Sequence, residues 1–479
     1  MFRPIVFTLA VVAVALNLHA QTPSERRPGR PAKAHPTPTP LPDNWDPTVR
    51  SVPGAIQPVS PPARAEALPP VLPKLTLRKA ENYALANQPR LAASQLNSQA
   101  DIQRVYEARS AFFPQVQANA VGVKAKEDSS RLAAVAGITD PTILSRQSDG
   151  LLVSQLITDF GRTYYLTTSA RSRALSSAQR TEVEREILLF RVDQAYFAVQ
   201  GAQSLLEVAN QTVSTNALLL DRTRALAVSA LKSSLDVSFA EVAAAQAKLL
   251  QIQAQARVQE GYAELSAALG LGRKVNFTLV PQDIGPEPTA EVGPLIENAL
   301  AHRPDLLAAR ADLDSAMRFA KAERAARYPT ITGQGGYGLN PAHREGDLPP
   351  NYGAIGVNLN IPVFTGGLLS ARDREAVLRA QAAQKLLEDQ ETQASRDVYN
   401  AWFEARTAYQ AIAVTQQLLN SSQQAFQLAQ GRYNVGTSSI VELSQAELQQ
   451  IQAQITAATS RFDYQVRRRA LDFQLGALK

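Results

Sequence analysis

The carboxyl-terminal part of the chain carries two long runs of apolar positions at helical spacing, separated by a short polar break. Before the break, apolar residues recur every three, four or seven positions at Val398, Trp402, Ala405, Tyr409, Ile412, Leu419 and Phe426. After the break, the same spacing continues at Ile451, Ile455, Ala458 and Phe462. This heptad-like stripe predicts two helices. The first pattern reaches back to about Leu368, so roughly 60 residues at ~1.5 Å each predict a rod of about 90 Å.

The polar break has the composition of a helical-hairpin tip. It runs through Arg432, Tyr433, Asn434, Val435, Gly436, Thr437, Ser438 and Ser439. Gly436 supplies the backbone freedom for a sharp reversal, and the hydroxyl residues beside it can cap the returning helix. A plain connecting loop is the alternative interpretation.

The whole pattern occurs twice in the chain. Residues 84–91 (ALANQPRL) return as residues 299–306 (ALAHRPDL), and the pair Phe113-Pro114 returns as Tyr328-Pro329. The closing Leu-xxx-Leu-Gly that ends at Gly270 returns at Gly476. Because these motifs recur at nearly constant offsets along the sequence, they predict an internal duplication. We expect a first repeat over 74–270, a Pro- and Gly-containing linker over 271–294, and a second repeat over 295–479.

Each repeat also contains two segments of alternating character. In residues 354–361 aliphatic side chains alternate with small or polar ones, which predicts a strand. Residues 115–120 and 330–334 repeat the pattern more weakly, and residues 151–157 complete a set of four strands. The linkers between paired strands, 124–150 and 339–351, are long and polar, as external loops would be.

The amino terminus has the character of an export signal. A basic residue followed by an apolar run over residues 5–18 predicts a signal peptide, 1–20, with an uncleaved anchor as the alternative. Residues 21–73 hold about half of the 29 prolines, which predicts a disordered or polyproline-like leader. No other apolar run is long enough for a membrane helix, so we expect any membrane crossing to be made by strands.

Four strands are too few to cross a membrane alone. The smallest outer-membrane barrels use about eight strands, and an open edge in lipid leaves backbone groups unpaired. We therefore expect several chains to share one barrel. Aromatic residues stand where each strand is expected to meet a helix, which favours an aromatic girdle at the membrane boundary, with simple hydrophobic staples as the alternative. These residues are Phe113, Phe160, Tyr328 and Phe364.

Composition argues against enzymatic chemistry. The chain has no cysteine, 2 methionines and 4 histidines, and its net charge of +6 is dispersed. We therefore expect no metal site, no cofactor and no nucleic-acid partner. The glycine pattern at Gly333, Gly335 and Gly338 formally matches a dinucleotide fingerprint, but no helix is expected after it, so we interpret it as part of a strand. Ser229 and Lys232 formally match a nucleophile pair, but they fall in the first hairpin tip. The sequence predicts a protein that is not an enzyme.

Taken together, these motifs resemble the TolC family of outer-membrane efflux and secretion channels. The resemblance runs from Leu75 to Lys479 and is carried by residues 303–310 (RPDLLAAR), the VGTS tip at 435–438, the closing Leu-xxx-Leu-Gly and the duplication. It implies an α+β membrane protein: a homotrimer whose twelve strands form one β-barrel in outer-membrane lipid. Twelve helical segments would continue it as a periplasmic α-barrel, with an equatorial mixed region.

The resemblance also implies partners and a function. A periplasmic adaptor and an inner-membrane transporter, of the RND type or alternatively the ABC type, would dock at the tapered end of the helices. The trimer would then be a passive exit duct for small toxic compounds in a tripartite efflux system. Two alternatives stay open: the exit duct of a type I protein secretion system and, from another class, a structural coiled-coil protein.

In the family, a tyrosine and charged contacts between neighbouring hairpins hold the tip closed. Carried over by position, this resemblance implies a gate formed by Tyr433 with Asp236 and Glu442, and Gly436 lies in the same tip. Two positions depart from the family pattern, because Ser438 replaces a basic residue and Gln445 replaces an acidic one. We therefore expect a closed state held by packing and neutral hydrogen bonds more than by ion pairs. Ala230 replaces the glycine of the first tip, so we expect that turn to follow a different path. Ordinary helix-surface roles are the alternative for all these positions.

Overall fold

The computed structural model describes residues 74–124, 129–131, 142–144, 146–289, 291–342 and 349–478. The described residues belong to one compact unit, Ile56–Lys479. The predicted signal peptide and leader lie outside the described residues.

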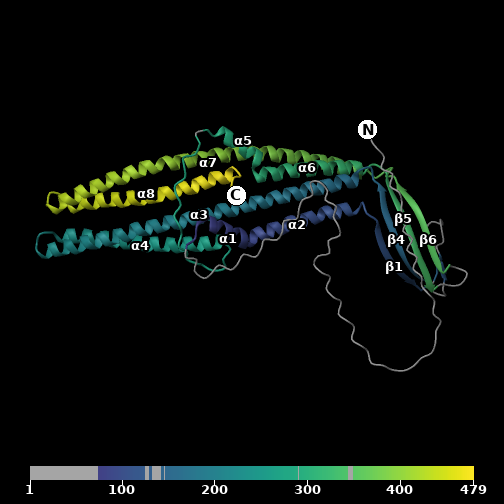
Figure 1. The fold of residues 1–479 in the computed structure, drawn as a ribbon, viewed down its shortest axis with the longest axis horizontal. Helices are drawn as coiled ribbons and strands as arrows, with labels where there is room; N and C mark the ends of the chain where they lie inside the picture. The colour runs from purple at the N-terminus through teal and green to yellow at the C-terminus, as the bar shows by residue number, and fades with distance from the viewer. Residues whose placement is uncertain are drawn as a thin grey trace, which may run out of the picture. The chain divides into compact units, whose positions relative to one another are not determined.

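The described chain runs through the same series of elements twice (Figure 1). The first series is α1 (Leu77–Asn87), α2 (Pro89–Ser110), β1 (Gln115–Val123), β4 (Arg146–Thr158), α3 (Arg162–Val228) and α4 (Ser234–Ala268). The second series is α5 (Gly293–His302), α6 (Pro304–Ala325), β5 (Thr330–Ala342), β6 (Asn351–Asn360), α7 (Leu368–Asn434) and α8 (Ile440–Gln474). Two short strands, β2 (Ser129–Arg131) and β3 (Thr142–Leu144), lie between β1 and β4. Corresponding helices match in length: α2 and α6 have 22 residues, α3 and α7 have 67, and α4 and α8 have 35.

The long helices are the main structural element of the unit. The sequence pattern placed the start of α7 correctly at Leu368, and its 67 residues give a rod of about 100 Å. Helix α3 packs against α2, α4, α6 and α8, and α7 packs against α6 and α8. The helices α2, α3, α6 and α7 therefore form a row in which each packs on the next. No helix in the described part of the chain is both long and apolar enough to cross a membrane.

The four main strands form one antiparallel sheet in the order β1-β4-β5-β6. Strands β1 and β6 are its two edges. Aliphatic side chains of β6 project into solvent in the single chain, since Ile355 is 91% exposed and Val357 is 69% exposed. The sheet thus has apolar side chains and two open edges that no described segment of the chain covers.

The strands are longer than the alternation predicted. Gln147 pairs with Ala342 and Asp149 pairs with Leu339, so β4 and β5 extend into the ranges that we expected to be external loops. The predicted bounds were wrong because backbone pairing continues through polar residues once two strands are in register. The glycine pattern from Gly333 to Gly338 lies within β5, as predicted.

A buried core of aliphatic and aromatic residues midway along α3 joins the first repeat to the linker between the repeats. Tyr196 is fully buried, and its hydroxyl donates to the carbonyl oxygens of Leu75 at 2.9 Å and Val280 at 2.6 Å. Leu75 also forms a parallel bridge with Leu279 in the linker between the repeats. Because this linker closes over α3, it is a packed segment as well as a connection. It belongs to the region where an equatorial belt was expected.

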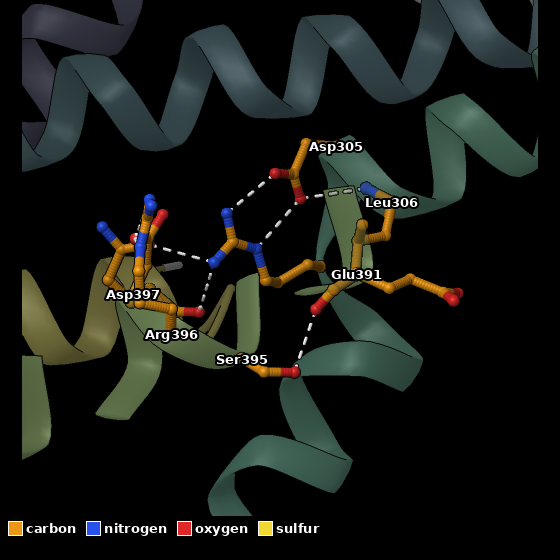
Figure 2. Close-up of polar contacts among 8 residues, drawn as sticks. Asp305, Leu306, Glu391, Ser395, Arg396 and Asp397 are labelled. Atoms are coloured by element: carbon orange, nitrogen blue, oxygen red, sulfur yellow. Dashed lines mark hydrogen bonds and ion pairs between the residues drawn. The ribbon is translucent and has the colours of Figure 1, made fainter. Parts of the chain in front are cut away.

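The Arg-Pro-Asp motif fixes the junction between α5 and α6 against the end of α8. Arg303 donates through Nε and Nη2 to the two carboxylate oxygens of Asp305, at 3.0 and 2.8 Å. Its Nη1 reaches the side chain of Gln474 in α8 at 3.0 Å. Figure 2 shows Asp305 accepting from the backbone N–H of Leu306, which completes the turn into α6. In the first repeat Gln88 replaces Arg303 and donates to the carbonyl of Ala268 at the end of α4.

The closing glycine of each repeat lies against this same junction. Gly270 has φ +77° and Gly476 has φ +66°, a region that favours glycine. A Cβ added at Gly270 would lie 2.9 Å from the carbonyl oxygen of Asn87, and one at Gly476 would lie 3.2 Å from the Cα of Arg303. The Leu-xxx-Leu-Gly motif is therefore explained by the close approach of two backbones.

We predict that Gly270→Ala lowers the free energy of unfolding by about 2 kcal/mol, since the new methyl group adds a clash to an unfavourable φ. Thermal unfolding followed by circular dichroism measures the loss. Gly272→Ala is the matched control, because a Cβ there meets no atom within 4 Å. Equal stability of the two variants would contradict this account of the motif.

Candidate functional site at the hairpin tips

The two hairpin tips follow the same backbone path. Gly436 has φ +80° and Ala230 has φ +55°, both left-handed. In each turn the N–H of the following residue bonds back to the helix, from Leu231 to the carbonyl of Leu226 and from Thr437 to that of Arg432, both at 2.9 Å. The expectation that Ala230 diverts the first turn was wrong. The helix-terminating hydrogen bonds determine the path, and alanine tolerates the strain of about 1 kcal/mol.

Each returning helix begins with a serine cap, as the sequence indicated for the second tip. Ser233 accepts from the N–H of Asp236 at 3.2 Å, and the Asp236 carboxylate accepts from the N–H of Ser233 at 2.9 Å, forming a capping box. Ser439 accepts from the N–H of Glu442 at 3.3 Å. The two acidic gate candidates, Asp236 and Glu442, are therefore both first-turn residues, where the helix dipole favours negative charge.

Tyr433 connects the two tips within one chain. Its ring is only 4% exposed and packs in a cluster with Phe426, Ile440 and Leu443 of its own hairpin. Leu219 and Phe239 of the first hairpin pack against the same cluster. The ammonium group of Lys232 lies 3.5 Å from the centre of the Tyr433 ring, a close cation–π contact.

Electrostatics at this contact couple Tyr433 to Asp236. Burial raises the pKa of Tyr433, and the nearby negative charge of Asp236 raises it further. Burial also acts to raise the pKa of Asp236, but hydrogen bonds from Ser233 and the charge of Lys232 outweigh it and lower that pKa below its ordinary value. The carboxylate of Asp236 is therefore stably charged beside a neutral tyrosine.

The second tip contains an ion pair that the sequence analysis did not anticipate. Arg432 Nη1 lies 2.9 Å from Glu442 Oε1, and Ser438 Oγ donates to Glu442 Oε2 at 2.7 Å. The structure thus brings Ser438 and Glu442 together by a hydrogen bond, and Gln445 is exposed one turn further along α8. The sequence did contain a signal for this pair, since the basic Arg432 stands just before the hairpin turn and the acidic Glu442 stands in the first helical turn after it. The prediction about contacts between neighbouring hairpins stays a prediction.

A groove lies between the two hairpins, above the tips. Its volume is about 380 Å³, and it is lined by apolar residues of α4 and α8 together with Thr212 and Asn216 of α3. Val242 and Leu448 on its rim are 54% and 57% exposed. Sequence reasoning missed this groove, because the positions that line it come from three helices with separate registers.

The groove contains one buried carboxyl group. Glu447 is 5% exposed, and its Oε1 accepts from the side-chain amide of Asn216 at 2.6 Å. Burial raises the pKa of Glu447 above its ordinary value, and the Asn216 hydrogen bond only partly opposes this. A carboxyl between two hairpins is thus biased towards its neutral form.

The four predicted boundary aromatics all lie at helix–strand junctions, as the sequence indicated. Phe113, Phe160, Tyr328 and Phe364 are 54%, 53%, 55% and 88% exposed. The rings of Phe160 and Tyr328 contact each other, with centroids 5.9 Å apart. Their place at a membrane boundary stays a prediction. In the described part of the chain, no group of three or more acidic or histidine side chains is placed to hold a metal ion.

Comparison with known proteins identifies this architecture. The family model of the outer membrane efflux proteins matches residues 82–271 and 295–477, and the chain belongs to this family of outer-membrane channel proteins. The toluene efflux pump outer membrane protein TtgC of Pseudomonas putida is 26% identical over 383 residues, covering 78% of this chain and 76% of TtgC. The outer membrane protein TolC of Vibrio cholerae is 25% identical over 397 residues, covering 80% and 86%.

Solved structures support the same fold. The outer membrane protein VceC of Vibrio cholerae has a TM-score of 0.71 at 20% identity, covering 84% of this chain and 96% of VceC. The open state of the MtrE outer membrane channel of Neisseria gonorrhoeae has a TM-score of 0.69 at 22% identity, covering 84% and 89%. The protein is thus an outer-membrane efflux channel component that extends into the periplasm. The resemblance to the TolC family stated from the sequence is confirmed.

We predict that Glu447→Gln stabilises the protein above pH 4.5, the ordinary value for a glutamate, and has little effect below it. A carboxyl whose folded pKa is raised favours folding only while it stays protonated, so wild-type stability falls as pH rises through the unfolded pKa towards the folded one. Unfolding temperatures at pH 4 and pH 8 measure this difference. Glu260→Gln, on the exposed surface of α4, is the control and should leave the pH dependence unchanged. A parallel pH profile for Glu447→Gln and wild type would rule out this role for Glu447.

Proposed function

We propose that the chain is one subunit of a homotrimeric exit duct for small toxic compounds in a tripartite efflux system. In this trimer twelve strands, four from each chain, close into one barrel within outer-membrane lipid. Twelve helical segments continue it as an α-barrel through the periplasm. The observation that carries the proposal is the four-stranded sheet, whose aliphatic side chains are exposed and whose edges β1 and β6 are unpaired in the single chain.

The proposed assembly rests on two homologous halves. Their main described elements match in order, their three longer helices match in length, and the family model matches in two segments. We infer the domain division 1–20 signal peptide, 21–73 leader, 74–270 first repeat, 271–294 linker and 295–479 second repeat. Two matched halves from each of three chains would give a barrel wall of six similar units, with β6 of one chain running antiparallel to β1 of the next.

The hairpin tips support a gate at the periplasmic end. Because the Tyr433 ring packs with Leu219 and Phe239 and lies against Lys232, it ties the second tip to the first within one chain. A tip can then open only if that contact breaks or if both hairpins move together. Gly436 and Ser438 lie on the turn of the second tip, and Glu442 and Gln445 lie on the first two turns of α8 beside it. We propose that these four positions face neighbouring hairpins in the trimer. We propose these positions as the gate.

The partners follow from the family. TtgC is named as the outer membrane protein of an efflux pump. We propose that a periplasmic adaptor docks in the groove between the hairpins and that an inner-membrane transporter of the RND type drives export. The groove offers apolar side chains at Val242 and Leu448 on otherwise polar helices.

The gate is tested by single-channel recording in planar bilayers. The double variant Tyr433→Ala with Asp236→Ala removes the packed ring and the charge beside it, so it should raise the opening frequency and the mean conductance. The control Glu260→Ala, on an exposed surface away from the contact, should behave as wild type. Unchanged conductance and opening frequency in the double variant would show that these are not gate residues.

The docking groove is tested with the purified cognate adaptor. Leu448→Glu places a charge among the apolar side chains and should weaken adaptor binding at least tenfold, measured by surface plasmon resonance. Leu218→Glu is the control, since Leu218 is similarly exposed (53%) on α3 but does not line the groove. Equal affinities of the two variants would remove the groove from the docking surface.

A further inference from the structure

A second cavity, distant from the tips, is lined by arginine and serine side chains. Its volume is about 620 Å³, within the range of ~300–1,000 Å³ typical of small-molecule sites. Its charged lining comprises four arginines and two aspartates, Arg104, Arg173, Arg180, Arg379, Asp101 and Asp312. The cavity therefore has an excess of positive charge.

Three of the arginines are already paired. Arg104 lies 2.5 Å from Asp101, Arg180 lies 2.6 Å from Asp312, and Arg379 lies 2.6 Å from Glu375 in α7. Within the described residues, Arg173 makes no ion pair or hydrogen bond. Its guanidinium group therefore has its full set of donors available to a ligand.

A buried hydroxyl lies beside this free cation. Ser176 lines the cavity and is 1% exposed, and its Oγ has no hydrogen-bond partner among the described residues. An unsatisfied buried hydroxyl is costly, and a ligand oxygen would remove that cost. Leu166 and Phe319 add an apolar wall to the same cavity. The lining thus combines a free guanidinium, a free hydroxyl and an apolar surface.

The arrangement of the helices sets the direction that the cavity faces. Its lining comes from α2, α3, α6 and α7, which pack in that order as a row. A single cavity that is lined by both the first and the last helix of this row requires the row to curve, and the cavity then lies on the concave side of the curve. In the proposed trimer the concave side of the row is the inner wall of the duct, so this step rests on the proposed function.

We propose that this cavity is a transient binding site for organic oxyanions that pass through the duct. Arg173 would pair with the carboxylate, sulfonate or phosphate group, Ser176 would donate to one of its oxygens, and Phe319 would contact the apolar part. The aspartates keep binding weak, which suits a site that solutes must also leave. At ~1.5 Å per residue, Leu166 and Arg180 lie about 12 and 33 Å along α3 from the end of β4 at Thr158. This depth favours a free solute over a lipid headgroup.

The test uses the full-length protein and naphthalene-1-sulfonate as the probe, with neutral 1-naphthalenemethanol beside it. Titration calorimetry in detergent should give binding of the sulfonate but not of the alcohol. Arg173→Gln should weaken sulfonate binding at least about tenfold, and Ser176→Ala by a smaller factor. Arg171→Gln is the matched control. Two residues along a helix correspond to a rotation of about 200°, so Arg171 lies on the face of α3 opposite to that of Arg173. Equal affinities of Arg173→Gln and Arg171→Gln would overturn the site.

Block of single-channel current separates this proposal from the proposed function. Sulfonate added from the side of the strand loops should reduce wild-type conductance, and Arg173→Gln should require at least about tenfold more probe. Block is expressed as the fraction of each protein's own conductance without probe, so that a change in conductance caused by the lost charge does not enter the comparison. A protein that forms no channel contradicts the proposed duct. A conducting protein that is blocked equally in both forms, or that binds the sulfonate without block, contradicts the oxyanion site in the duct wall.

Discussion

The unpaired edges of a four-stranded sheet are the constraint on which the rest of this structure depends. Backbone N–H and C=O groups at the outer edges of β1 and β6 have no partner among the described residues, and the aliphatic side chains of β6 are exposed. In lipid, each unpaired backbone group costs several kcal/mol. One chain cannot meet this cost, because its strands are too few to close. In the proposed trimer, β6 of each chain pairs with β1 of the next, so no edge is left open.

The arrangement of the strands determines the arrangement of the helices. Each strand connects to a helix through a short junction, so the spacing of strands in a closed barrel fixes the spacing of the helices that follow. The interfaces along α3 and α7 are accordingly rich in alanine and serine, which allow long helices to lie side by side. The linker between the repeats is held to the middle of α3 by the hydroxyl of Tyr196. At the other end, Tyr433 holds both tips together.

Much of this architecture could be predicted from the sequence, because local patterns determine it. The stripe from Leu368, the serine caps, the reversal at Gly436 and the position of all four junction aromatics follow from spacing and turn chemistry alone. The strand ends could not be predicted, since pairing with a neighbouring strand extends β4 to Arg146 and β5 to Ala342 regardless of polarity. The turn at Ala230 was mispredicted because residue preference was weighed without the hydrogen bonds that override it. The Asn216–Glu447 pair joins residues more than 200 positions apart, and no local pattern indicates such a contact.

The central claim is that three chains pool their strands to close one barrel. Light scattering of the purified, detergent-solubilised protein, corrected for bound detergent, tests it most directly. The account predicts a protein mass close to three times that of one chain, whose full sequence has a mass of 51.8 kDa, and precipitation or aggregation when detergent is removed. A particle with the mass of one chain that stays in solution without detergent would contradict it.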